Sequence, residues 1–128
     1  MVKKDGKMIE YYSNGRIQFE GEHKKGKKWN GIGYNIVGDK VYEIKEGKGH
    51  VKECDFYCGE LLFEGEYLNG ERHGKGKDYD KDGKLLFEGE YLNGNKWNGK
   101  GYDQNGNIIY ELKNGKGTIK EYNLKVNI

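Results

Sequence analysis

The sequence contains no proline, no alanine and only two cysteines among its 128 residues. Without alanine, long helices lose their best helix-forming residue. No apolar run approaches the length of a transmembrane helix, and the start, MVKKDGKMIEYYSNG, lacks the apolar segment of a signal peptide. We therefore expect a cytoplasmic protein, with peripheral membrane contact as an alternative, in which Cys54 and Cys58 are free thiols.

An excess of one charge sign is also missing. The chain has 23 Lys and Arg against 21 Asp and Glu, a formal net charge of +2. Nucleic acid, which calls for a concentrated basic surface, is not an expected partner. Leu, Ile, Val and Phe together supply only about a fifth of the residues, so a conventional central core would be thin. The 17 Tyr, Trp and Phe side chains supply packing instead, and a thin, elongated single domain (1–128) fits best.

Glycine and an internal repeat are what the sequence has in abundance. There are 22 glycines, and FEGEYLNG occurs at 63–70 and again at 87–94. A longer copy of the segment at Phe19 reappears at Phe87, 68 positions later. Residues 1–18 are expected to form an N-terminal hairpin or cap, and residues 120–128 a C-terminal edge strand. Units begin at the aromatic residues Phe19, Tyr42, Phe63, Phe87 and Tyr110.

Each unit is typical of a β-hairpin. Asn-Gly favours a two-residue type I′ turn, in which both residues have positive φ, and alternation places Phe63 and Tyr67 on one face. The expected partners in this unit are Tyr67–Arg72, Gly65–Gly74 and Phe63–Gly76. Glycine leaves an opening that an aromatic ring can cover, which would offset the weakness of glycine in a strand.

The longer units have one additional residue, which a three-residue loop Asn93-Gly94-Asn95 is expected to absorb. The resulting pairs are Phe87–Gly101, Gly89–Gly99 and Tyr91–Trp97, and by the same count Phe19–Gly33, Gly21–Gly31 and His23–Trp29. The short units from Tyr42 and Tyr110 are expected to have lost most of the turn. Asp82-Gly83, Asn105-Gly106 and Gly38-Asp39 mark a second set of turns, which completes a β-meander.

The unit FEGEYLNGERHGKG at 63–76 resembles the MORN repeat. The segment YYSNGRIQFEGEHKKGK near the start is similar to a variant of this repeat found in bacterial antitoxin-like proteins. The resemblance implies an all-β, elongated, twisted antiparallel ribbon of hairpins with aromatic residues along a groove. It also implies a non-catalytic scaffold or adaptor that binds a protein, a second copy of itself, or phospholipid.

Catalytic and metal-binding interpretations have weaker support. His23, His50 and His73 lie in or beside expected strands, and His50, Cys54 and Cys58 offer three zinc ligands where four are needed. The alternating acids Glu64, Glu66, Glu88 and Glu90 fit a solvated face balanced by lysines, such as Lys75 across from Glu64. We expect no enzymatic activity, no metal, no cofactor and no small-molecule substrate.

The binding candidates are therefore surfaces. Exposed aromatic patches mark interaction sites, and the expected groove consists of Phe19, Trp29, Phe63, Tyr67, Phe87, Tyr91, Trp97 and Tyr110. A basic loop with Lys24, Lys25, Lys27 and Lys28 could instead meet anionic phospholipid. The functions that remain open are a protein-binding scaffold with self-association, a small bacterial or phage-borne inhibitor that blocks an enzyme, and a membrane-associating adaptor.

Overall fold

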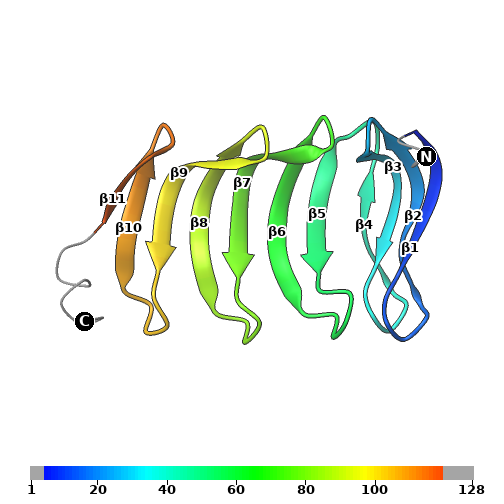
Figure 1. Ribbon diagram of the computed structural model, residues 1–128, viewed down its shortest axis with the longest axis horizontal. Coiled ribbons are helices and arrows are strands. Elements are labelled where there is room, and N and C mark those ends of the chain that lie inside the picture. Colours follow the sequence, from blue (N-terminus) through cyan, green and yellow to red (C-terminus); the bar gives the residue numbers. More distant parts are fainter. Residues whose placement is uncertain (1–4, 120–128) are drawn as a thin grey trace.

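The computed structural model describes residues 5–119, which form an all-β ribbon of antiparallel hairpins (Figure 1). The part described contains no helix, and so no helix that could cross a membrane. The predicted fold class is confirmed. The strands are β1 (Gly6–Tyr11), β2 (Ile17–Lys24), β3 (Lys27–Tyr34), β4 (Lys40–Ile44), β5 (Gly49–Cys54), β6 (Leu61–Leu68), β7 (Glu71–Tyr79), β8 (Leu85–Leu92), β9 (Asn95–Tyr102), β10 (Ile108–Lys113) and β11 (Lys116–Ile119).

The ribbon consists of two open sheets, with strand orders β1-β2-β3-β4 and β11-β10-β9-β8-β7-β6-β5. Between β4 and β5 only an isolated bridge, Lys45 to Lys48, continues the pairing. The buried core nevertheless crosses this break, because Val51 of β5 packs with Ile44 of β4. Tyr67 packs against both this cluster and the one around Phe63. The predicted strand at 120–128 lies outside the described residues.

Two rows of turns line the long edges of the ribbon (Figure 1). The upper turns are five two-residue turns with positive φ at both residues, as the type I′ geometry requires: Lys25-Gly26, Glu46-Gly47, Asn69-Gly70, Asn93-Gly94 and Asn114-Gly115. The lower turns span residues 12–16, 35–39, 55–60, 80–84 and 103–107. The prediction that the short units had lost most of the turn was wrong, since each has a complete two-residue turn, Glu46-Gly47 and Asn114-Gly115.

The register of the long units is confirmed at the glycines: Gly21 pairs with Gly31, Gly89 with Gly99, Phe19 with Gly33 and Phe87 with Gly101. Closer to the upper turns the prediction was wrong. His23 pairs with Lys28 and Tyr91 with Lys96, while Leu92 pairs with Asn95. The additional residue is therefore absorbed by a β-bulge at Trp29 and at Trp97, and not by a three-residue loop.

The central unit, β6–β7, also departs from the prediction. Tyr67 faces Arg72 as expected, but Gly65 pairs with Gly76 and Phe63 with Asp78. A bulge around His73 and Gly74 takes up the difference, and Glu64 consequently lies across from Lys77, not from Lys75. The observed register aligns the glycines of neighbouring hairpins, because Gly76 pairs with Gly65 on one side and with Gly89 on the other.

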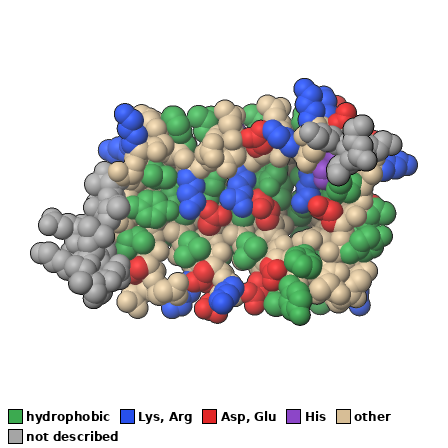
Figure 2. Space-filling view, viewed as in Figure 1, with side chains coloured by type: hydrophobic (Ala, Val, Ile, Leu, Met, Phe, Trp, Pro, Cys, Tyr) green, Lys and Arg blue, Asp and Glu red, His purple; other side chains and the backbone are tan. Residues whose placement is uncertain are grey.

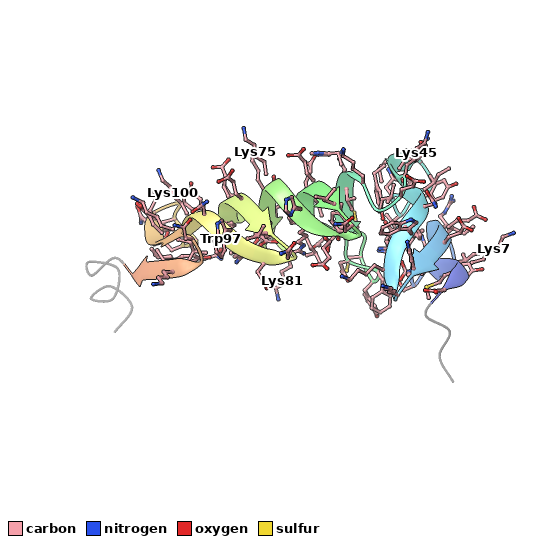
Figure 3. All side chains as sticks on the ribbon, turned by 90° about the horizontal axis from the view of Figure 1, so that it is seen from above. Lys7, Lys45, Lys75, Lys81, Trp97 and Lys100 are labelled. Atoms are coloured by element: carbon pink, nitrogen blue, oxygen red, sulfur yellow. The ribbon has the colours of Figure 1, made fainter. Side chains whose placement is uncertain are left out.

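The ribbon is one sheet thick, so its two faces differ in chemistry. Alternation places Phe63, Gly65 and Tyr67 on one face, which we call the aromatic face, and Glu64 and Glu66 on the other, the charged face. Figure 2 shows the aromatic face, with cationic and acidic side chains between hydrophobic ones. Seen from above in Figure 3, Lys75 and Lys100 project from the charged face.

Candidate binding surfaces

On the aromatic face, rings lie directly over glycines. A Cβ placed on Gly76 would stand 2.7 Å from the Phe63 ring, and one on Gly99 would stand 2.6 Å from the Phe87 ring. A Cβ on Gly33 would meet the Tyr42 ring at 1.9 Å. The glycines thus make the seats in which the rings pack, as the sequence predicted.

A cation covers the outer side of each of the three buried phenylalanine rings, those of Phe19, Phe63 and Phe87. The Lys28 Nζ lies 5.1 Å from the Phe19 centroid, the Arg72 guanidinium 4.1 Å from that of Phe63, and the Lys96 Nζ 4.9 Å from that of Phe87. Cation–π contacts of this kind contribute about 0.5–2 kcal/mol each. The three phenylalanines have no exposed surface, although the sheet is a single layer.

The Arg72 guanidinium is held by acids on both sides. Its Nε and Nη2 donate to the two oxygens of Glu53 at 2.9 and 3.0 Å, and its Nη1 donates to Asp78 at 3.3 Å. Tyr67 donates to Glu53, and Tyr91 donates to Asp78 at 2.6 Å. Burial alone would raise the pKa of Glu53, but the hydrogen bonds from Arg72 and Tyr67 outweigh it, and the pKa lies below its ordinary value.

The two tryptophans lie at the upper edge. Trp29 and Trp97 are the bulged residues, and their half-buried rings contact the upper-turn glycines of the next hairpin, Gly47 and Gly115. Their carbonyl groups accept the N–H of those same glycines at 2.7 and 2.8 Å. These residues therefore fasten successive hairpins together.

The structure divides the predicted groove residues by depth. Phe19, Phe63, Phe87 and Tyr91 are buried, with at most 3 % of their surface exposed, so a partner cannot reach them directly. The half-buried members, which keep some accessible surface, are Trp29, Tyr67, Trp97 and Tyr110. The aromatic groove stays a prediction, reduced to these four residues.

The four lysines of the basic loop do different things. Lys24 lies over the Trp29 ring at 4.6 Å, Lys27 pairs with Glu71, and Lys28 covers Phe19. Lys25 occupies the upper turn with positive φ. Lipid contact through this loop stays a prediction, which these separate contacts do not strengthen.

The sequence reasoning missed an exposed apolar cluster on the lower edge. Val37, Phe56 and Tyr57 are 64 %, 57 % and 69 % exposed. They lie on two lower turns that contact a third one at residues 12–16. Ser13 donates from its N to the Phe56 carbonyl and from its Oγ to the Tyr57 carbonyl, both at 2.8 Å, and Asn14 Nδ2 donates to the Ile36 carbonyl at 3.1 Å. Ile36 packs on Gly59 beneath them. We call Ile36, Val37, Phe56 and Tyr57 the apolar turn cluster.

The repeat itself contains the signal that could have identified this cluster. The corresponding turns further along the chain read DKDGK from Asp80 and DQNGN from Asp103, with polar residues at their tips. Only the turns NIVGD and DFYCGE carry apolar tips among these four. Since turns at the surface favour polar residues, apolar residues at two adjacent turns indicate a contact surface.

Among the described residues, no three His, Cys, Asp or Glu side chains are grouped to hold a metal ion. His50 contacts Glu64 at 3.0 Å, away from the cysteines. Cys54 and Cys58 are free, as predicted, and the pKa of each is raised, foremost by loss of solvation. His23 is buried beside Phe19, and no partner is seen for its Nδ1 in the described structure.

These features define a class of protein: an open, single-layer ribbon of antiparallel hairpins in which aromatic rings pack on glycines and an apolar cluster is exposed at the lower edge. The family model of the MORN repeat variant matches residues 4–25 and 72–93, and the predicted resemblance to MORN-repeat proteins is thereby confirmed. The two matches begin 68 positions apart, the same offset as the internal copy. No curated protein and no solved structure matches the chain.

The matched segments also show how the repeat is phased. Each consists of a strand, a lower turn and a strand, namely β1–β2 and β7–β8. The unit predicted from Phe63 consists of β6 and β7 around an upper turn. The two descriptions differ by one strand, so the family repeat is centred on the edge that carries the apolar turn cluster.

Proposed function

We propose that this chain is a non-catalytic protein-binding module whose contact surface is the apolar turn cluster. MORN repeats are generally protein- or membrane-binding modules, which supports the class. The observation that carries the proposal is the exposure of Val37, Phe56 and Tyr57 at turns whose copies are polar. Aromatic residues at the centre of a small apolar patch are the side chains that most often dominate binding energy.

The surroundings of the cluster favour a protein partner over a lipid surface. Asp55 stands beside the aromatic pair, and backbone N–H groups of Tyr57 and Cys58 lower the pKa of its carboxyl, which keeps it ionised. The Arg16 Nη1 donates to the Val37 carbonyl at 2.9 Å, so charges of both signs border the cluster. A polar rim with hydrogen-bonding groups around an apolar centre is the usual anatomy of a protein interface.

The test uses a double variant, Phe56→Ser with Tyr57→Ser. The backbone carbonyls of both residues, and not their side chains, bind Ser13, so the fold is expected to survive. The matched control is Lys81→Ser with Asp82→Ser on a polar lower turn. The immobilised protein is used to capture partners from a lysate of the cells that naturally make it. We expect the wild type and the control to retain the same partner protein, and the Phe56/Tyr57 variant to retain at most about 10 % of that amount.

Circular dichroism confirms that each variant is folded before the comparison. Equal retention of all captured proteins by the folded Phe56/Tyr57 variant would overturn the assignment of the surface. Retention of anionic vesicles that is lost in the same variant would instead favour the membrane-associating alternative.

A further inference from the structure

The charged face carries an ordered row of charges that neither the family match nor the proposed function uses. Strand pairing places six side chains next to one another across β5 to β10, and their signs alternate at every step. We call this row the charge ladder: Lys52, Glu64, Lys77, Glu88, Lys100 and Glu111. A second row runs parallel to it, in which His50 pairs with Glu66, and Lys75 with Glu90.

The ladder remains accessible although its central pair is in contact. Lys77 and Glu88 are 3.5 Å apart, and their side chains are 50 % and 47 % exposed. Between the two rows lies a hollow of about 460 Å³, whose floor includes Gly65, Gly76 and Gly89. Because these glycines face the aromatic side, the floor of the hollow is backbone between the two charged rows, and side chains of a second surface can enter it.

We propose that two copies of this chain pair through their charged faces, related by a two-fold axis that runs parallel to the strands between β7 and β8. This operation lays β7 on β8 of the second copy, β6 on β9 and β5 on β10. Lys77 then faces Glu88, Glu64 faces Lys100, and Lys52 faces Glu111. Every charge of the ladder therefore faces a charge of opposite sign. In the second row, Lys75 likewise faces Glu90.

The alternation of charge along the ladder favours this two-fold axis over the other two-fold axes that would bring the charged faces together. A two-fold axis along the length of the ribbon would lay each strand on its own copy. Glu64 would then face Glu66, and Lys75 would face Lys77, and such like-charge contacts are costly. An axis through the centre of a strand would also place like charges together. Only an axis between two strands joins opposites, and the one between β7 and β8 uses all six strands.

Apolar residues flank the ladder and fit the same axis. By alternation, Leu62, Tyr79, Leu86 and Tyr102 continue the charged face toward the lower edge. The axis lays Tyr79 on Leu86 and Leu62 on Tyr102. Leu62 is 37 % exposed in the single chain, and the pairing would cover it.

The size of the contact is adequate for a dimer in solution. The contact is six strands wide, at about 4.8 Å per strand, and about seven residues long, at about 3.3 Å per residue. These dimensions give an area of roughly 670 Å² per copy. Stable interfaces of ordinary size bury about 800 Å² per partner. Because the contact is largely electrostatic, we expect it to weaken as ionic strength rises.

Charge reversal at the central pair tests the proposal. Lys77→Glu makes each copy present two glutamates at the axis, and Glu88→Lys makes it present two lysines. Each variant alone should have a dissociation constant about tenfold or more above that of the wild type, because symmetry creates two like-charge contacts. An equimolar mixture should recover the affinity. The glutamate introduced in one copy then faces the lysine introduced in the other, and the unchanged Glu88 of the first copy faces the unchanged Lys77 of the second.

Sedimentation equilibrium at low and high salt measures these dissociation constants. Lys81→Glu, on a lower turn away from the ladder, is the matched control and should associate like the wild type. A wild type that is monomeric at about 100 μM in low salt, or a mixture that associates no better than its components, overturns the proposal. The Phe56/Tyr57 double variant should still dimerise, so the outcome is separate from that of the proposed function.

Discussion

At the scale of the residue, glycine is the determinant of this structure. A single-layer sheet offers only one side against which a ring can pack, yet Phe19, Phe63 and Phe87 are fully buried. They achieve this because the glycines beneath them let the rings reach the backbone, while a Lys or Arg side chain covers the outer side. The aliphatic stems of these cations supply apolar cover as well as charge.

Gly76→Ala tests this packing. The added methyl group would stand 2.7 Å from the Phe63 ring and 3.0 Å from the Tyr91 ring, so both rings must move outward. We expect a loss of about 1–3 kcal/mol in the free energy of unfolding, measured by urea denaturation. Gly117→Ala is the control: it is exposed, its nearest contact is the flexible end of Leu112, and a change below about 0.5 kcal/mol is expected. Equal losses in the two variants would contradict the ring-seat interpretation.

Residue patterns predicted the rings and their glycine seats, since both are consequences of alternation and pairing. They did not predict which rings would be inaccessible, because the cover over Phe63 comes from Arg72, whose orientation depends on Glu53 of a strand two positions away. The exposure of Phe56 and Tyr57 was missed for a related reason. Aromatic residues in the repeats suggested a groove, and the turns between them were assessed only for their conformation.

At the scale of the element, the bulges decide how hairpins are joined. The additional residue in β3 and β9 is a tryptophan whose carbonyl group accepts a hydrogen bond from the next upper turn. The following asparagine takes part, since Asn30 and Asn98 accept from the N–H of Glu46 and Asn114 at 2.8 and 2.9 Å. A hairpin considered alone could absorb this residue in its loop. The bulge places these hydrogen-bonding groups against the next hairpin, and the sequence pattern within one unit contains no information about that contact.

The first sheet contains a pH-sensitive element, because burial lowers the pKa of His23 below its ordinary 6.5. The neutral ring is therefore favoured in the fold, and the unfolded chain takes up the proton first as pH falls. The contribution of neutral His23 to the free energy of unfolding is fully present above pH 6.5, and it is lost as the pH falls toward the pKa of His23 in the folded protein.

His23→Tyr tests this element, because Tyr91 occupies the equivalent position in the internal repeat that begins at Phe87. Tyr91 packs edge-on against Phe87 as His23 does against Phe19. We expect the free energy of unfolding of the wild type to fall between pH 7.5 and 5.5 with a slope of at most about 1.4 kcal/mol per pH unit. The variant should show a shallower slope over this range. Parallel pH profiles, measured by urea titration, would show that His23 does not carry the dependence.

At the scale of the whole molecule, two sheets share one continuous core. Pairing is interrupted between β4 and β5, but Tyr67 packs against the clusters on both sides of the break. We expect the two sheets to unfold together, because neither can lose its structure without exposing the core of the other.

Tryptophan fluorescence can test this, because Trp29 lies in one sheet and Trp97 in the other. Trp97→Phe leaves Trp29 as the only reporter, and Trp29→Phe leaves Trp97. The two urea transitions should each coincide with the loss of strand signal in circular dichroism of the same variant. Adding Tyr67→Ala should separate the reporters, since it removes the side chain that spans the break. A Trp29 transition that precedes the strand signal without this substitution would mean that the sheets unfold independently.

The hydrogen bonds along the upper edge have a consequence for the evolution of the chain. Each upper turn after the first donates its glycine N–H to the hairpin before it: Gly47 to Trp29, Gly70 to Gly47, Gly94 to Arg72 and Gly115 to Trp97. All four acceptors are main-chain carbonyl groups, which any residue provides. Gene duplication or deletion can therefore add or remove whole hairpins while the main-chain hydrogen bonds of the junction form again, so the number of hairpins can change while the spacing between them is preserved.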